Sequence, residues 1–406
     1  MENPKIRFKG FTKDWEQRKL GELGSLKNGM NFSKEAMGHG FPFINLQNIF
    51  GNNVIDVNKL ELADATEKQL LEYSLLKGDV LFVRSSVKLE GVGEAALVPE
   101  TLENTTYSGF IIRFRDEYGL NNDFKKYIFG TQKVRNQIMA QATNSANKNI
   151  SQGVLENLTF EVPSFDEQAK IGEHFSNLDH LITLHQRKCE QTKKLKKYML
   201  QKMFPQNGAK VPEIRFDGFT YDWEQRKLSE LLEKYEDPVE TPHDGYERVG
   251  IRSHAKGTFH SFVEPGKELD TAKMYRVAAD KFILNITFAW EHAVAITDNN
   301  DAGKLVSHRF PQFSFNPKLK PHFFKYLMLD KKFREHLELS SPGGAGRNRV
   351  LKISDMLKYE IKLPSIEEQI KIGEYFDSLD HLITLHQRKC DELKKMKKYM
   401  LQNMFI

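Results

Sequence analysis

The stretch PSFDEQAKIGEHFSNLDHLITLHQRKC at residues 163–189 returns almost unchanged as PSIEEQIKIGEYFDSLDHLITLHQRKC at residues 364–390. The repeat continues to Phe204 in the first copy and to Phe405 in the second, and 31 of its 42 positions are identical. An internal repeat of this length determines the architecture before any local feature is considered. The chain is therefore built from two related halves.

Each copy of this repeat has the pattern of one long helix. Ser164 or Asp166 can cap the first copy after Pro163, and no proline follows until position 205. A helix of this length spans roughly 58 Å, since each residue adds about 1.5 Å. Apolar residues recur in steps of four and three, in the order Ile171, Phe175, Leu178 and Ile182 in the first copy and Ile372, Phe376, Leu379 and Ile383 in the second.

This near-heptad stripe predicts that each helix packs against one partner helix. The other copy is the obvious partner, which gives an antiparallel intramolecular coiled coil. The alternative is two separate amphipathic helices, each lying on its own domain. We favour the paired arrangement, because a helix of roughly 58 Å overhangs a domain of about 140 residues.

A second, shorter repeat opens each half. KIRFKGFTKDWEQRKL at residues 5–20 and EIRFDGFTYDWEQRKL at residues 213–228 share 13 of 16 positions, while the segments 21–162 and 229–363 diverge. We therefore expect a mixed α/β (α+β) fold with two homologous globular domains and an internal pseudo-twofold repeat. The expected boundaries are domain 1 at 1–162, helix 1 at 163–204, a linker at 205–212, domain 2 at 213–363 and helix 2 at 364–406.

Local patterns follow the same order in both divergent segments. Residues 76–86 and 280–290 have the composition of strands, and residues 121–139 and 320–337 that of helices. We interpret the segments as two domains of one fold whose surfaces have drifted apart.

Composition excludes several classes of protein. The chain has 406 residues, 39% of them hydrophobic, with a net charge of +5 and only two cysteines. It lacks an apolar run long enough to span a membrane and the apolar core of a secretory signal, so we expect a cytoplasmic protein. Cys189 and Cys390 form no CxxC pair, and we expect them to be small core thiols rather than metal ligands or a disulfide.

Catalytic signatures are absent from the sequence. It has no GxxxxGK[ST] loop, no GxGxxG after a strand, no HExxH and no GxSxG. Asp355 followed by Glu360 and Lys362 is a weak nuclease-like trace that we do not favour. His185 and His386 invite a metal site, but without a second ligand at suitable spacing we expect hydrogen-bonded seam residues and no metal.

These motifs resemble those of the specificity subunit of type I restriction-modification systems. The resemblance rests on WEQRKL opening each half, GDVLF at 78–82, NRVLKIS at 348–354, and LPSIEEQ followed by LDHLITLHQRK in the second half. It covers nearly the whole chain. It implies two target-recognition domains, each binding one half of a bipartite DNA site, with two helices paired antiparallel as a spacer.

The resemblance also implies partners and cofactors. The expected partners are double-stranded DNA, two modification (methyltransferase) subunits and restriction or translocase subunits. S-adenosylmethionine, ATP and magnesium are then expected only on those subunits, so that this chain is a non-catalytic DNA-binding subunit. The rival hypotheses are a duplicated scaffold that binds only other proteins and a self-sufficient nuclease or methyltransferase.

Candidate DNA contacts are Arg, Lys, Asn, Ser and His residues in polar or glycine-rich stretches, since these side chains bind base edges and phosphates. The run from Ser341 to Arg349 can let backbone approach a phosphate, with a plain turn as the alternative. The full set is Lys27, Asn28, Arg84, Ser85, Ser86, Lys88 and Lys148 in domain 1, and Arg252, Ser253, His254, Lys256, Arg309, Arg347, Asn348 and Arg349 in domain 2.

Overall fold

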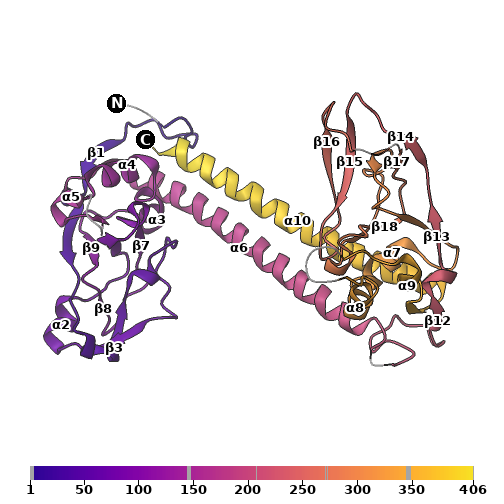
Figure 1. Cartoon of the computed structure of the whole chain (residues 1–406). Helices are drawn as coiled ribbons and strands as arrows, with labels where there is room; N and C mark the ends of the chain where they lie inside the picture. Colours follow the sequence, from indigo (N-terminus) through magenta and orange to yellow (C-terminus); the bar gives the residue numbers. More distant parts are fainter. Residues whose placement is uncertain are drawn as a thin grey trace. The chain divides into compact units, whose positions relative to one another are not determined.

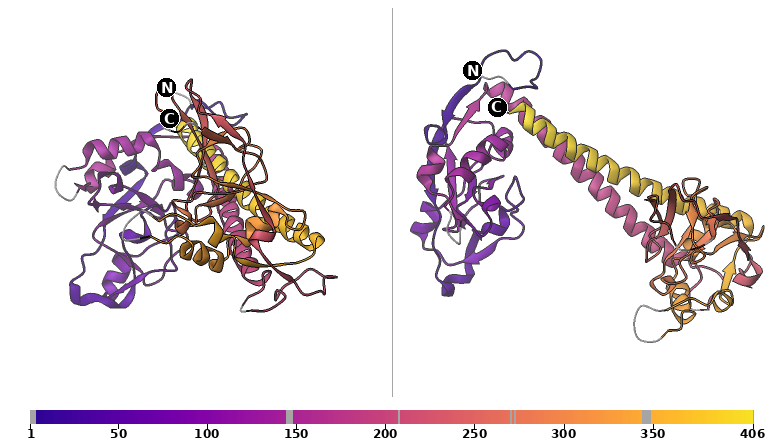
Figure 2. Two further views of the ribbon diagram at one scale, coloured as in Figure 1. Left: turned by 45° about the vertical axis from the view of Figure 1, so that its right-hand side comes forward. Right: turned by 45° about the horizontal axis from the view of Figure 1, so that its top comes forward.

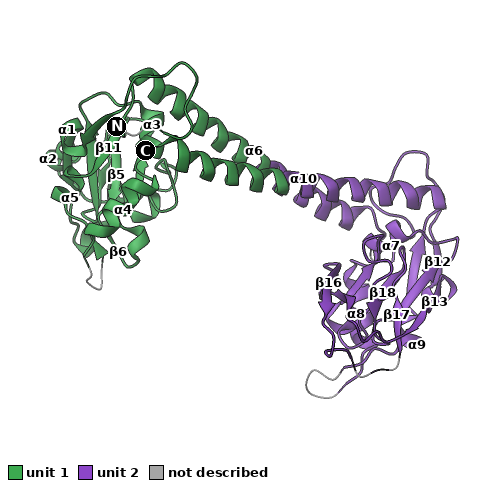
Figure 3. Ribbon diagram, turned by 90° about the horizontal axis from the view of Figure 1, so that it is seen from above, with its two compact units in different colours: residues 1–186, 387–406 green, residues 187–386 purple. Residues whose placement is uncertain are grey.

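The computed structural model describes residues 4–143, 148–206, 208–269, 271, 273–343 and 349–405. The chain forms two compact units, drawn in two colours in Figure 3. Unit 1 comprises residues 1–186 and 387–406, and unit 2 comprises residues 187–386. Each unit therefore contains a globular part and one half of each long helix.

The globular part of unit 1 is built on a four-stranded antiparallel sheet in the order β2-β9-β5-β7. A second sheet has the order β4-β3-β8, and short pairs form between β1 and β11 and between β6 and β10. The strands are β1 (Glu16–Lys19), β2 (Gly24–Asn28), β3 (Met37–Ile44), β4 (Glu61–Ala63), β5 (Val80–Val83), β6 (Ser85–Ser86), β7 (Ala95–Leu97), β8 (Thr106–Tyr107), β9 (Ile111–Asp116), β10 (Lys148–Asn149) and β11 (Thr159–Val162).

Short helices cover this sheet and build the core. They are α1 (Leu20–Leu23), α2 (Glu67–Glu72), α3 (Asn122–Ile128), α4 (Gln132–Gln141) and α5 (Gln152–Glu156). The predicted helical run 121–139 is thus two helices, which separate around Gly130. Phe82 on β5, Phe129 after α3 and Phe160 on β11 stack edge to face with ring centroids 5.0–5.6 Å apart, and they form the centre of the unit 1 core.

Unit 2 repeats the first sheet as β13-β21-β18-β19, and pairs β12 with β22. Its second sheet is larger, in the order β14-β17-β20-β15-β16. The strands are β12 (Glu224–Lys227), β13 (Leu232–Tyr235), β14 (Pro238–Glu240), β15 (Tyr246–Ile251), β16 (Thr258–Val263), β17 (Lys273–Arg276), β18 (Phe282–Leu284), β19 (Val294–Ile296), β20 (Leu305–Val306), β21 (Gln312–Phe315) and β22 (Glu360–Leu363), and the short helices are α7 (Pro321–Leu327), α8 (Lys331–Leu339) and α9 (Ile353–Met356).

One backbone feature shows that the two globular parts share a frame. Gly78 precedes β5 with a φ of +92°, and Asp280 holds the corresponding place before β18 with a φ of +56°. Aspartate tolerates this left-handed conformation better than most residues. The strand predicted from GDVLF in domain 1 is therefore retained in unit 2, where the sequence no longer shows the motif.

The predicted long helices are α6 (Phe165–Lys202) and α10 (Ile366–Met404). At their first turns the backbone N–H groups of Glu167 and Glu368 donate to the hydroxyls of Ser164 and Ser365. Ser164, not Asp166, is therefore the cap of α6.

The two helices pack antiparallel in each unit, which confirms the predicted pairing over the separate arrangement. In unit 1, Ile171, Phe175, Leu178 and Ile182 share one core with Cys390, Leu393 and Met404 of α10 and with Phe405, which follows it. In unit 2, Met203 at the end of α6 lies in one core with Ile372, Phe376 and Leu379. Figure 1 shows the two helices side by side in each unit.

The first and the last described segments of the chain meet in unit 1. The Ile6 N–H donates to the Asn403 carbonyl oxygen at 2.9 Å, and the first residues described lie beside the end of α10 in the views of Figure 2. Unit 1 is thus closed by segments from the beginning and the end of the chain.

Candidate nucleic-acid interface

In unit 1 the structure brings Lys148 next to three predicted residues that lie far from it in the sequence, Arg84, Ser85 and Ser86. Ser85 and Ser86 on β6 pair antiparallel with Asn149 and Lys148 on β10. The Ile150 N–H donates to the Arg84 carbonyl oxygen at 2.9 Å, which holds this short ladder at the end of the buried strand β5. Arg84, Ser85, Ser86 and Lys148 therefore lie on one edge of the domain.

A surface hollow of about 520 Å³ adjoins this edge. Ser85, Ser86 and Lys88 line it together with three exposed apolar side chains, Phe50, Val87 and Phe110. Leu46, Gly91 and the acidic residues Glu90 and Glu94 complete the lining. Val87 is 78% exposed and Phe110 58% exposed, which is unusual for large apolar residues. Apolar groups and hydroxyls suit the base edges of a DNA groove, where a thymine methyl lies beside hydrogen-bonding groups, and a carboxylate such as Glu90 or Glu94 can accept from the cytosine amino group.

Phe50, Val87 and Phe110 were not among the residues predicted from sequence. The only available signal was that Val87 lies between predicted contacts, because the exposure of an apolar residue is set by the tertiary fold.

Lys27 and Asn28 do not line this hollow. Lys27 Nζ lies 3.0 Å from Glu72 and 4.9 Å from the centre of the Tyr73 ring, so its charge is already paired within the domain. Asn28 is exposed at the end of β2. The Arg84 guanidinium donates to the Gly109 carbonyl oxygen at 3.3 Å and is half-buried.

In unit 2 the predicted residues Arg252, Ser253, His254 and Lys256 form the turn between β15 and β16. His254 and Ala255 adopt left-handed conformations, and their N–H groups donate to the carbonyl oxygens of Glu291 and His292. The Ser253 hydroxyl donates to Glu291 Oε2 at 2.6 Å. This turn is thus anchored to the segment after β18.

Two arginines approach the same segment. Arg349 lies 5.4 Å from the centre of the Trp290 ring and 3.4 Å from Glu338, and Arg309 is exposed before β21. The Arg309 carbonyl oxygen accepts from the Ile286 N–H, and the Leu351 N–H donates to the Ile286 carbonyl oxygen. The predicted contacts Arg347 and Asn348 lie outside the described residues.

The backbone hydrogen bonds of Ile286 in unit 2 match those of Arg84 in unit 1, and they show which positions of the two units are equivalent. The Arg84 N–H donates to the Phe110 carbonyl oxygen as the Ile286 N–H does to Arg309. The 201-residue offset of the long repeat likewise relates Lys148 to Arg349. Lys148 lies shortly before Ile150, whose N–H donates to Arg84 after β5, and Arg349 lies shortly before Leu351, whose N–H donates to Ile286 after β18. The same place in the fold therefore carries Phe110 and Lys148 in unit 1, and Arg309 and Arg349 in unit 2.

The three ionisable groups of the nuclease-like trace, Asp355, Glu360 and Lys362, contact separate parts of unit 2. Asp355 forms an ion pair with Lys358, which lowers the pKa of the aspartate, while Glu360 accepts from Gln225 and Lys362 donates to the Gly208 carbonyl oxygen. Each group of the nuclease-like trace thus has a different partner.

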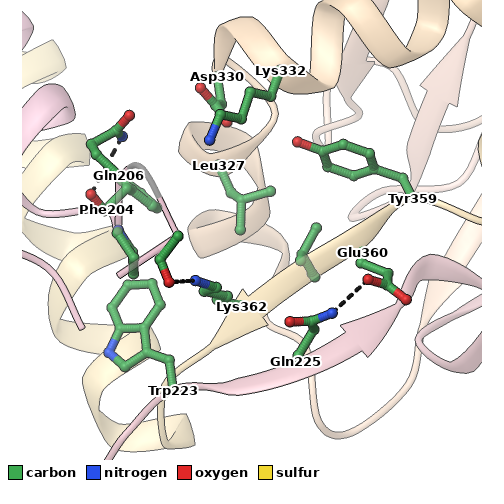
Figure 4. Close-up of a pocket in the computed structure, with 13 residues that line it drawn as sticks. Phe204, Gln206, Trp223, Gln225, Leu327, Asp330, Lys332, Tyr359, Glu360 and Lys362 are labelled. Carbon is green, nitrogen blue, oxygen red and sulfur yellow. Dashed lines mark hydrogen bonds between the residues drawn. The ribbon is translucent and has the colours of Figure 1, made fainter. Parts of the chain in front are cut away.

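A pocket of about 350 Å³ lies beside these residues in unit 2 (Figure 4). Trp223, Tyr359 and Lys362 line it, and none of the predicted DNA contacts does. Over the described ranges, no group of three or more His, Cys, Asp and Glu side chains is arranged to hold a metal ion. None of the helices in the described part of the chain combines the length and hydropathy that crossing a bilayer requires.

The two seam cysteines are buried thiols, and Cys189 Sγ lies 3.8 Å from the Ile383 carbonyl oxygen. Of the eight predicted seam positions, Ile383 is half-buried and the other seven are buried.

Comparison with known proteins gives a consistent result. A curated relative, the putative type I restriction enzyme MjaX specificity subunit of Methanocaldococcus jannaschii, is 26% identical over 96% of this chain and 92% of its own length. The EcoKI specificity subunit of Escherichia coli is 28% identical over 37% of this chain and 32% of its own length.

Solved structures show the same fold. The S subunit of the type I restriction-modification system from M. genitalium matches with a TM-score of 0.56 and 15% identity, and covers 100% of this chain and 99% of that one. The model of the type I restriction modification DNA specificity domain matches residues 12–194 and again residues 221–395. This chain therefore belongs to the family of the type I restriction modification DNA specificity domain, and it carries that domain twice.

Proposed function

We propose that this chain is the non-catalytic DNA specificity subunit of a type I restriction-modification complex. Its two recognition domains, residues 21–162 and 229–363, each bind one half of a bipartite DNA site. The paired helices α6 and α10 set the spacer between the half-sites and bind the modification subunits.

The observation that carries this proposal is one fold that presents different side chains at equivalent positions. Phe110 and Lys148 in unit 1 correspond to Arg309 and Arg349 in unit 2. An arginine can donate two hydrogen bonds to guanine, whereas an apolar ring contacts a thymine methyl. Two domains with the same frame and different contact groups read two different half-sites, so the complete site is asymmetric.

The helices also offer surfaces for partner subunits. Leu181 and Leu184 in unit 1 are 40% and 36% exposed, and lie about 140 to 200° around α6 from Asp179, which faces the recognition domain. Leu382 and Leu385 occupy the equivalent positions in unit 2 and are 40% and 48% exposed. Apolar side chains exposed as a group are typical of protein interfaces.

Because each unit carries one copy of this surface, two modification subunits are proposed to bind, one at each. S-adenosylmethionine, ATP and magnesium are assigned to the modification and restriction or translocase subunits. The complex is placed in the cytoplasm, where its DNA substrate is found.

Domain exchange tests the function. Residues 21–162 are replaced by the equivalent segment of another member of the family, and the chain is produced with its modification subunit in a host whose methylated bases are then mapped. We expect one half of the methylated sequence to change and the other half to stay the same. The matched control is the exchange of residues 229–363, which should change only the other half.

If either exchange changed both halves of the methylated sequence, or neither half, the result would contradict the proposal that each domain recognises one half-site. Methylation by the purified chain alone, supplied with S-adenosylmethionine and DNA, would contradict the non-catalytic role.

A further inference from the structure

In each unit a single carboxylate joins the recognition domain to both long helices. In unit 1 the Tyr127 hydroxyl on α3 donates to Asp179 Oδ2 on α6 at 2.9 Å. Lys397 Nζ on α10 donates to the two oxygens of the same carboxylate at 2.6 and 2.8 Å. The ammonium also lies 5.1 Å from the centre of the Tyr127 ring, so the three side chains contact one another.

Unit 2 repeats this joint with the two helices exchanged. The Tyr326 hydroxyl on α7 lies 2.9 Å from Asp380 Oδ2 and 2.6 Å from Asp377 Oδ1, both on α10, so its proton is shared between two carboxylates. Lys196 Nζ on α6 lies 2.5 Å from Asp380 Oδ1. Lys196 lies 5.0 Å from the centre of the Tyr326 ring. Lys196 and Lys397 are equivalent positions of the two copies of the long repeat, so the same lysine serves both units.

Both tyrosines are held in a dry environment. Tyr127 is 4% and Tyr326 2% exposed, and burial raises the pKa of each phenol, so each hydroxyl remains a donor. Hydrogen bonds to a charged acceptor are shorter and stronger than those between neutral groups.

A second point of attachment lies seven residues before Asp179, on the same side of α6. A Cβ atom at Gly172 would lie 2.6 Å from Asp123 Cβ and 2.7 Å from the Phe124 nitrogen, so α3 touches the helix backbone there. Gln168 Oε1 accepts from the Asn121 N–H at 2.9 Å, one turn earlier. The recognition domain is thus held at three points along α6, which fixes its angle as well as its position.

We propose that Tyr127, Asp179 and Lys397, with Tyr326, Asp380 and Lys196, are positioning residues that determine how strictly one spacer length is required. This inference rests on the proposed function. The half-site sequences are read elsewhere, on the hollow and the turns described above. When these contacts are lost, the recognition domain can change its angle relative to the helix pair, and the complex can then bind half-sites at neighbouring spacings.

The test uses the full chain assembled with its modification subunits. The Tyr127→Phe variant removes a single hydroxyl, and Asp179→Asn removes the charge. The matched controls are Tyr118→Phe, an exposed tyrosine of the same unit, and Glu173→Gln, an exposed carboxylate on α6. The substrate is a pool of DNA in which the spacer ranges from two base pairs shorter to two longer than the native one.

For both joint variants we expect the ratio of methylation at the native spacer to methylation at spacers one base pair away to fall about tenfold, which corresponds to about 1.4 kcal/mol. The base preference within each half-site should not change, and both controls should keep the wild-type ratio. Tyr326→Phe should act in the same way.

An unchanged ratio in a Tyr127→Phe complex with wild-type Tm would overturn the inference, and so would an equal loss at every spacer, which indicates a merely structural role. A wild-type complex that methylates no bipartite sequence would instead overturn the proposed function itself.

Discussion

His292 shows how one buried residue makes unit 2 sensitive to pH. Its ring nitrogen Nε2 lies 2.9 Å from the Met328 carbonyl oxygen, and burial lowers the pKa of the imidazole below its ordinary value. As the pH falls below about 6.5, the unfolded chain therefore takes up this proton before the folded unit does. Stability from this group is complete at higher pH and is lost as the pH falls.

The variant His292→Asn tests this, because asparagine tolerates the left-handed backbone at position 292. We expect the variant to be less stable than the wild type at pH 7.5. Between pH 7 and 5 its free energy of unfolding should decline less steeply, by at most about 1.4 kcal/mol per pH unit. Urea denaturation at several pH values measures both slopes, with the exposed His308→Asn as control. Equal slopes would remove His292 as the cause.

Prediction from sequence succeeded for residues whose environment is set by local periodicity. The steps of four and three identified Ile171, Phe175 and Leu178, all of which are buried. It did not foresee that Ser85 and Ser86 pair with Lys148 and Asn149, because two-residue strands 62 positions apart leave no periodic signal. Whether any of the predicted contacts touches DNA remains a prediction.

At the scale of elements, the long helices are the proposed ruler. Inserting four residues after Gln186 in α6 and four after His386 in α10 leaves the contacts within each unit intact, since the division between units falls there. The insertion adds about 6 Å of length and about 40° of rotation. We expect the preferred spacer to lengthen by about one or two base pairs, with both half-sites unchanged. Mapping of methylated sites measures this, and an unaltered spacer in an active complex would exclude the helices as the ruler.

Elements also show where repetition in the sequence stops being informative. The sheets β2-β9-β5-β7 and β13-β21-β18-β19 correspond, as the shared landmarks predicted. The second sheets have three and five strands. The order β4-β3-β8, with one antiparallel and one parallel pair, returns in unit 2 as β16-β15-β20, and β14 and β17 are added to it. The repeat therefore predicts the common frame of the domains, and the added strands β14 and β17 depend on sequence that is particular to unit 2.

At the scale of the whole molecule, unit 1 depends on the last part of the chain. Cys390, Leu393, Met404 and Phe405 are buried in its core. Removing residues 387–406 should cost about 6 to 12 kcal/mol, since each of these four buried side chains contributes about 1.5 to 3 kcal/mol. This cost is comparable with the about 5 to 15 kcal/mol that stabilises a typical domain, and the Lys397 ion pair is lost as well.

We expect this truncation to abolish the folding of unit 1 while unit 2, which is continuous in sequence, resists protease. Limited proteolysis followed by mass measurement of the surviving fragment checks this result. A truncated chain in which both units resist digestion equally would show that the final segment is dispensable.

The construction of unit 1 from two segments that are distant in sequence also has a consequence for synthesis. The ribosome must add about 200 further residues after Gln186 before the segment that completes unit 1 begins to emerge, which takes about 10 to 40 s at typical rates of elongation. Throughout this interval Phe175 and its neighbours on the nascent α6 lack their cover. A second nascent chain on the same messenger offers an identical α10, so exchange of this helix between copies competes with closure within one chain, and it does so more strongly when ribosomes are closely spaced.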